Sequence, residues 1–213
     1  NETRDINWHQ WAHDTIGTRI EGSNGFEITT PSTGTPGAID LATGTLHDED
    51  LDFTTGRQQV IRGWRLASST KYTYADYSTP YIGTAGQPQY LNVDGPYSLA
   101  NVTGSKFACY WVYASLDIAR PIYVFAPSTE YTTIAQARAE AAPALTGFRL
   151  NTEMKILYRW IFKGDGAFQE SADYRASAPL PGGGSTTVSA GNVTYAAGGG
   201  ISATSVQTAI EEL

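Results

Sequence analysis

The longest apolar stretches lie in the middle of the chain and have the pattern of β-strands. Two near-continuous apolar runs, "KFACYWVYASL" and "PIYVFAP", are separated by the short segment "DIAR". Runs of this length and composition favour strands that are covered on both faces of a sheet. We therefore predict that both segments are central strands.

Further strands are predicted on either side of these two in the sequence. "RQQVIRGWRLA" and "KYTYADYS" flank a short "SST", and their aromatic and β-branched residues favour a hairpin. "EMKILYRWIFKG" alternates with a period of two, which predicts one apolar face made by Met154, Ile156, Tyr158, Trp160 and Phe162. The middle of the chain is thus predicted to form a sheet.

Helical patterns are rare. "TIAQARAEAAPAL" predicts the one internal helix, because alanine has the highest helix propensity and Pro143 would end it. Residues 22–45, which include "TTPSTGTPGA", are dense in glycine, threonine, serine and proline and predict turns and short strands that link rather than form a core. We interpret residues 1–45 as an extended N-terminal attachment region and residues 46–177 as a strand-rich globular domain.

The end of the chain has a different pattern. "RASAPLPGGGSTT" has linker composition, so residues 178–200 are interpreted as a linker that includes a short strand. In residues 201–213 the apolar positions Val206, Ile210 and Leu213 are spaced by four and then three, which is the start of a heptad seam. A lone helix needs about 12–15 residues to be stable in water, so this stripe requires a partner that buries it.

Composition agrees with a mainly β protein of the α+β type. Only 16% of the 213 residues are charged, while there are 22 glycines and 13 tyrosines. The formal net charge of −7 would repel a phosphate backbone, which argues against nucleic acid as a partner. No apolar run approaches the length of a membrane span, so no membrane insertion is expected.

Candidate metal ligands are few, and each has a simpler interpretation. His9 and His13 are four residues apart beside Asp14, but Gln10 occupies the position of the glutamate in the "HExxH" zinc motif. Ordinary hydrogen-bonding histidines are the preferred interpretation. The acidic stretch "LHDEDLDF" lacks the glycine and spacing of a calcium loop, so we predict a solvated acidic turn. No metal and no cofactor are expected.

Catalytic motifs are equally weak. No "GxSxG" elbow is present, and Cys109, the single cysteine, lies in a predicted strand without a nearby histidine and is interpreted as a buried core residue. A pair of glycosidase carboxylates would meet only in the fold and stays an open alternative. Exposed aromatic rings could stack on sugars, but we favour core positions for Trp64, Trp111 and Trp160. We therefore expect no catalytic residue.

Two sets of motifs resemble known proteins. "VTYAAGGGISATSVQTAIEEL" resembles a segment of bacteriophage tail fibres in which "ISATNVQAAIEEL"-like text precedes a trimeric shaft, with Ser205 and Thr208 in place of the usual asparagine and alanine. "LATGTLHDEDLDF", "WVYASLDIARPIYVFAP", "AQARAEAAPAL" and "MKILYRWIFKGDGAFQESADYR" are similar to a domain of phage tail and fibre proteins. In that domain a "TGTLHDGDI" stretch leads to a module ending in "LYRxIF", and Glu49 stands where the pattern often has glycine.

The resemblance implies a non-enzymatic, homotrimeric component of a virion appendage, which links the particle to host-recognition parts. Its partners would be two copies of itself and other proteins of the tail, collar or baseplate, with host glycan contacted through regions beyond this segment. Val206, Ile210 and Leu213 would form the trimer interface, because three copies of the stripe could bury one another. Because the chain begins at Asn1 and its heptad pattern stops after one repeat, we interpret it as part of a longer polypeptide.

Two alternatives stay open at this point. The first is a carbohydrate-binding module, which would present a row of exposed tyrosine or tryptophan rings. The second is a tailspike that depolymerises capsule, which would depend on aspartate or glutamate residues brought together by the fold.

Overall fold

The computed structural model describes residues 18–20, 25–29, 40–48, 51–93, 97–145, 147–148 and 153–176. The chain divides into two compact units, residues 1–183 and 184–213, and every described residue belongs to the first. This part of the chain is mainly β, as predicted, with one short helix among its described residues.

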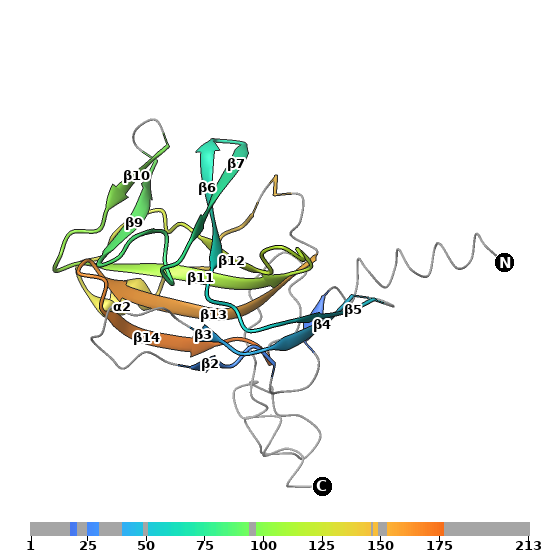
Figure 1. Ribbon diagram of the computed structural model, residues 1–213. Helices are drawn as coiled ribbons and strands as arrows, with labels where there is room; N and C mark the ends of the chain where they lie inside the picture. The colour runs from blue at the N-terminus through green and yellow to red at the C-terminus, as the bar shows by residue number, and fades with distance from the viewer. Residues whose placement is uncertain are drawn as a thin grey trace, which may run out of the picture. The chain divides into compact units, whose positions relative to one another are not determined.

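A six-stranded mixed sheet forms the centre of this unit (Figure 1). Its order is β14 (Phe168–Asp173), β13 (Met154–Lys163), β11 (Phe107–Ser115), β12 (Ile122–Phe125), β6 (Ile61–Ser68) and β7 (Lys71–Tyr77). All neighbours are antiparallel except β12 and β6, which are parallel. The predicted hairpin is confirmed as β6 and β7, and the two apolar runs are confirmed as the central strands β11 and β12.

The side chains of β13 do not share one face, so the prediction from simple alternation is wrong for this strand. Opposite the bond between Val112 and Tyr113 the register shifts, and Leu157 is the extra residue. Such a bulge reverses the face of every residue on one side of it. Tyr158, Trp160 and Phe162 consequently face one core cluster, whereas Met154 and Ile156 face the other.

Three small sheets accompany the central one. β1 (Arg19–Ile20), β4 (Gly44–Asp48) and β5 (Leu51–Thr55) form the first, and β2 (Ile28–Thr29) pairs with β3 (Asp40–Leu41) in the second. β8 (Gly83–Thr84), β9 (Gln87–Asn92) and β10 (Ser98–Asn101) form the third.

Residues 22–45 contribute to the core, contrary to the prediction that they only link other segments. Phe26 and Leu41 are at most 1% exposed and belong to the same apolar cluster as Trp160 and Phe162. The hydroxyl of Tyr158 donates a 2.9 Å hydrogen bond to the carbonyl of Phe26. The apolar side chains of this segment are too sparse to show a period, so the burial of Phe26 and Leu41 was not indicated by the local composition.

Most of the acidic stretch lies in the paired strands β4 and β5, so the prediction of a solvated turn is wrong for these residues. Asp48 is only 8% exposed, and the ring of His47 bonds to the exposed carboxylate of Asp52. Strand pairing between Leu46 and Phe53 explains the difference, because it fixes the alternation that turns Asp48 inward.

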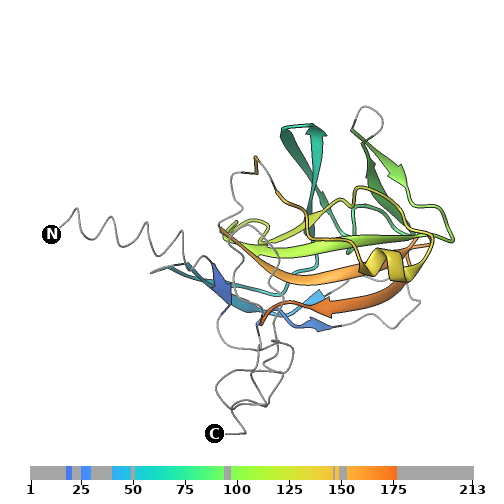
Figure 2. The ribbon, with the colours of Figure 1, turned by 180° about the vertical axis from the view of Figure 1, so that it is seen from behind.

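The internal helix is present but is shorter than predicted. α2 (Ile134–Arg138) begins with a capping box in which Thr133 and Gln136 bond reciprocally, and it ends five residues before Pro143. α2 lies against β11 and β13 (Figure 2), and its only buried residue is Ala137. With one buried side chain, little packing energy favours a longer helix.

Candidate functional site

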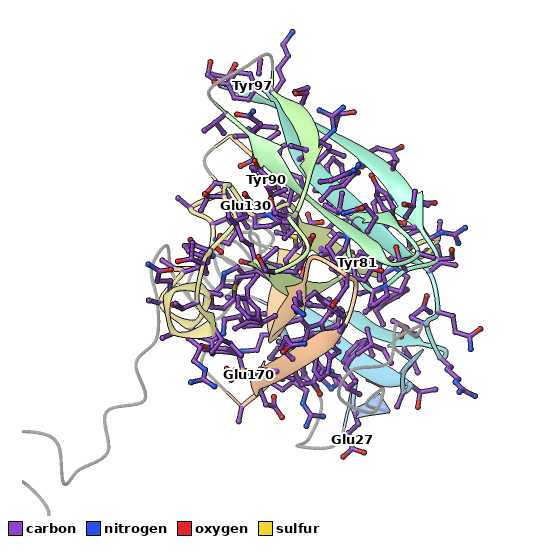
Figure 3. The ribbon with its side chains drawn as sticks, turned by 90° about the vertical axis from the view of Figure 1, so that its left-hand side faces the viewer. Glu27, Tyr81, Tyr90, Tyr97, Glu130 and Glu170 are labelled. Carbon is purple, nitrogen blue, oxygen red and sulfur yellow. The ribbon has the colours of Figure 1, made fainter. Side chains whose placement is uncertain are left out.

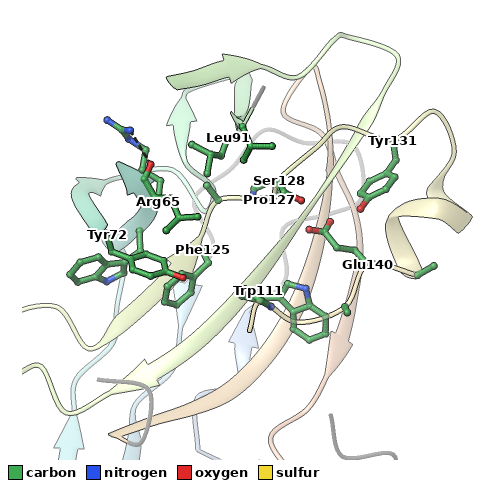
Figure 4. Close-up of a pocket in the computed structure, with 16 residues that line it drawn as sticks. Arg65, Tyr72, Leu91, Trp111, Phe125, Pro127, Ser128, Tyr131 and Glu140 are labelled. Carbon is green, nitrogen blue, oxygen red and sulfur yellow. Dashed lines mark hydrogen bonds between the residues drawn. The ribbon is translucent and has the colours of Figure 1, made fainter. Parts of the chain in front are cut away.

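A cavity of about 480 Å³ lies over the face of the sheet that carries Cys109, Trp111 and Tyr113. Its walls come from β6, β7, β11 and β12, and the segments before and after α2 cover it (Figure 4). This volume is within the usual range for small-molecule sites, about 300–1,000 Å³. It is the best candidate for a functional site in the described part of the chain.

Aromatic side chains line much of this cavity, and their neighbours hold them in place. The lining rings are Trp64, Tyr72, Trp111, Phe125 and Tyr131. The Trp64 ring centroid lies 4.8 Å from that of Phe148, and Tyr72 lies 5.1 Å from the same ring, both edge to face. Edge-to-face packing is a favourable aromatic geometry, so these walls are preformed.

Glu140 is the acidic residue of the lining (Figure 4). Burial raises the pKa of its carboxyl group to about 7, and this effect outweighs hydrogen bonds from Tyr131, Cys109 and the backbone of Ser128. One of its oxygens, Oε2, is buried without a hydrogen-bond partner in the described part of the chain. A buried acid of this kind is a recognised sign of a functional site.

Glu140 differs from the other perturbed glutamates because it has no basic partner among the described residues. Burial opposes ionisation of Glu130, but hydrogen bonds from Lys106 and Thr103 lower its pKa overall. The pKa of Glu170 is lowered by the guanidinium groups of Arg138 and Arg159. These two glutamates lie at separate places on the unit (Figure 3). No arginine or lysine contributes to the shift at Glu140.

The fold around α2 determines where Glu140 lies. Arg138, in the last turn of the helix, donates a 2.7 Å hydrogen bond from Nε to the carboxylate of Glu170 in β14. Arg159 of β13 donates 2.6 Å and 3.2 Å hydrogen bonds to the carbonyl of Arg138 and to Glu170. These bonds attach the end of the helix to two strands, and Glu140 follows two residues later.

The lining also contains a basic residue, whose charged group lies away from the aromatic rings (Figure 4). Arg65 lines the cavity, but Figure 4 shows its guanidinium pointing away from the aromatic rings. Its Nη1 donates a 2.8 Å hydrogen bond to the carbonyl of Tyr97. The indole N–H groups of Trp64 and Trp111 are buried without a hydrogen-bond partner among the described residues.

The residues singled out in the sequence have different outcomes. Cys109 is fully buried as predicted, and burial strongly raises the pKa of its thiol. Trp160 and Trp111 are confirmed as core residues, and Trp64 is partly buried and packs against the same cluster as Trp111. Trp64 and Trp111 also line the cavity. The predicted trimer positions Val206, Ile210 and Leu213, and also His9 and His13, lie outside the described residues.

Sequence reasoning missed Glu140 as a site residue. The residue was interpreted only as part of a helix. Within the described ranges no cluster of three or more metal-ligating side chains is found. No helix in the described part of the chain is long and apolar enough to cross a bilayer.

The chain was compared with known proteins in three ways. No model of a protein family matches it, and no curated protein and no solved structure matches it significantly.

Proposed function

We propose that this chain is a structural component of a phage tail fibre or a related virion appendage, and that it acts as a homotrimer. The observation that carries the proposal is the stripe of Val206, Ile210 and Leu213 in a segment that resembles the start of a trimeric fibre shaft. An amphipathic helix this short gains stability only when its apolar stripe is buried, and three identical copies satisfy that requirement symmetrically. The protein would link the particle to host-recognition parts and would have no catalytic role.

The contacts of Arg175, two residues after β14, support this proposal. Arg175 bonds to both carboxylate oxygens of Asp173, and its Nη1 donates a 2.8 Å hydrogen bond to the carbonyl of Gly25. Its guanidinium also lies 5.4 Å from the ring centroid of Tyr158. A fibre must transmit force between its parts, and these contacts attach the segment after β14 to two other segments of the unit.

Light scattering tests the proposal through the mass of the particle. The whole chain is expected to have three times the mass of one chain, and removal of residues 198–213 is expected to loosen or dissociate the particle. Ile210→Asp places a charge in the stripe and should dissociate the trimer, because a buried unpaired carboxylate is strongly unfavourable. Thr208→Asp adds the same charge outside the stripe and should leave the mass unchanged. A monomeric whole chain would refute the proposal.

A further inference from the structure

Among the described residues no basic side chain pairs with the carboxyl group of Glu140, and this indicates the chemistry of a ligand for the cavity. Buried charges in proteins are normally paired, because an isolated ion in a low-dielectric site is costly. Glu140 receives hydrogen bonds from Tyr131 and Cys109, which are neutral groups. Arg159 of β13 directs its Nη1 and Nη2 groups to the carbonyl of Arg138 and to Glu170.

The aromatic walls add a second, independent indication. Electron-rich ring faces attract ammonium groups, and sites built from several such rings are a known way to recognise alkylammonium ions. Here Trp64, Tyr72 and Trp111 line the same cavity as Glu140. The formal net charge of −7 also attracts cations to the protein as a whole.

We propose that this cavity binds an organic ammonium ion, with Glu140 as its counter-ion and the rings of Trp64 and Trp111 in its walls. The site does not depend on the trimeric fibre function, and its occupant is defined by a positive nitrogen that carries alkyl groups. The volume of about 480 Å³ exceeds what such a head group fills, so the ligand carries a further body.

The proposal predicts a pH dependence with a definite sign. The ammonium ion requires the carboxylate form of Glu140, and the pKa of about 7 means that this form is a minority at pH 6 and the majority at pH 8. The apparent affinity scales with the competent fraction, so binding should be about tenfold weaker at pH 6 than at pH 8.

Choline and its neutral isostere 3,3-dimethyl-1-butanol are the probes, because they share a shape and differ in charge. The test follows the indole N–H signals of the whole chain by nuclear magnetic resonance. Choline at pH 8 should shift the signals of Trp64 and Trp111 and leave that of the core residue Trp160 unchanged. The isostere should bind at least about tenfold more weakly, because it has no charge for Glu140 or the rings. Isostere binding as tight as choline binding would overturn the proposal.

Variants of the whole chain complete the experiment. Glu140→Gln preserves shape and should reduce choline affinity at least about tenfold at pH 8, with loss of the pH dependence. Glu153→Gln removes one negative charge outside the cavity lining and should bind choline normally. Retained affinity in Glu140→Gln would refute the role of the counter-ion, and no shift at about 100 mM choline would refute the site.

A methyl glucoside that bound while choline did not would instead identify a site for neutral sugars. The mass of the trimer is measured in a separate experiment. A failure of choline binding and a failure of trimer formation can therefore be distinguished.

Discussion

The two faces of the six-stranded sheet are covered in different ways. On one face, Trp160 and Phe162 are covered by residues that come from far along the chain, among them Phe26 and Tyr81, and every member of this cluster is at most 6% exposed. On the other face, a five-residue helix and its flanking segments cover the sheet incompletely and leave the cavity that contains Glu140. The first face is closed by its cover, and the second keeps a space that side chains do not fill.

The largest expected effect tests the closed face. Trp160→Ala should reduce the free energy of unfolding by about 3–5 kcal/mol, because Trp160 is fully buried and its removal leaves a void. Trp64→Ala, in the wall of the cavity, should cost clearly less because its ring is only half-buried. Denaturant unfolding of both variants measures the difference. Equal losses would mean that the two faces do not differ in packing.

The second prediction concerns pH and the open face. The pKa of Glu140 is raised to about 7 in the folded protein, so folding favours its protonated form. Glu140 therefore contributes stability to the folded state below the ordinary glutamate pKa. This contribution is lost as the pH rises through about 7. Between pH 4 and pH 8 the free energy of unfolding of the native protein should fall by about 3 kcal/mol relative to that of Glu140→Gln. Parallel stability curves for the two proteins would contradict the burial of this acid.

A third, smaller effect tests how tightly the N-terminal segment packs on the closed face. A Cβ atom at Gly44 would lie 2.3 Å from Cδ2 of Phe26, which is itself fully buried. Gly44→Ala should therefore cost about 1–3 kcal/mol through overpacking. Gly56→Ala is the matched control, because nothing lies within 4 Å of the added atom. A thermal melt that is unchanged by Gly44→Ala would show that Phe26 can move aside.

The smallest expected effect lies in the helix that positions Glu140. Thr133→Ala removes the side-chain acceptor for the N–H of Gln136, at 3.3 Å, and should cost about 1 kcal/mol. A frayed helix would also place Glu140 less accurately, so choline affinity should fall by a small factor. Thr129→Ala, outside the helix, is the control for both measurements. An unchanged melting temperature would contradict the capping role of Thr133.

Strong local patterns in the sequence predicted much of the sheet. The strands β11 and β12 and the hairpin of β6 and β7 could be predicted from their local sequence alone. Their burial is reflected in continuous apolar or aromatic-rich segments. The faces of β13 were predicted wrongly because one extra residue, Leu157, reverses the alternation. The core role of Phe26 was missed because it depends on contacts with β13, more than a hundred residues away.

The cavity was harder to predict than the sheet. Trp64 and Trp111 lie in strand patterns like that of Trp160, so only the incomplete cover over one face places them in the wall of a cavity. Glu140 gains its raised pKa from burial by segments that no local pattern brings together. The incomplete cover follows from the early end of α2, which alanine-rich composition alone did not indicate.

The most direct test of the account measures the protonation of Glu140 itself. The carboxyl carbon of this residue can be followed through a pH titration by nuclear magnetic resonance, with and without choline. The account predicts a pKa of about 7 in the free protein, and a lower pKa when choline is present, because a cation favours the charged form. A pKa in the ordinary range for glutamate, unchanged by choline, would contradict it.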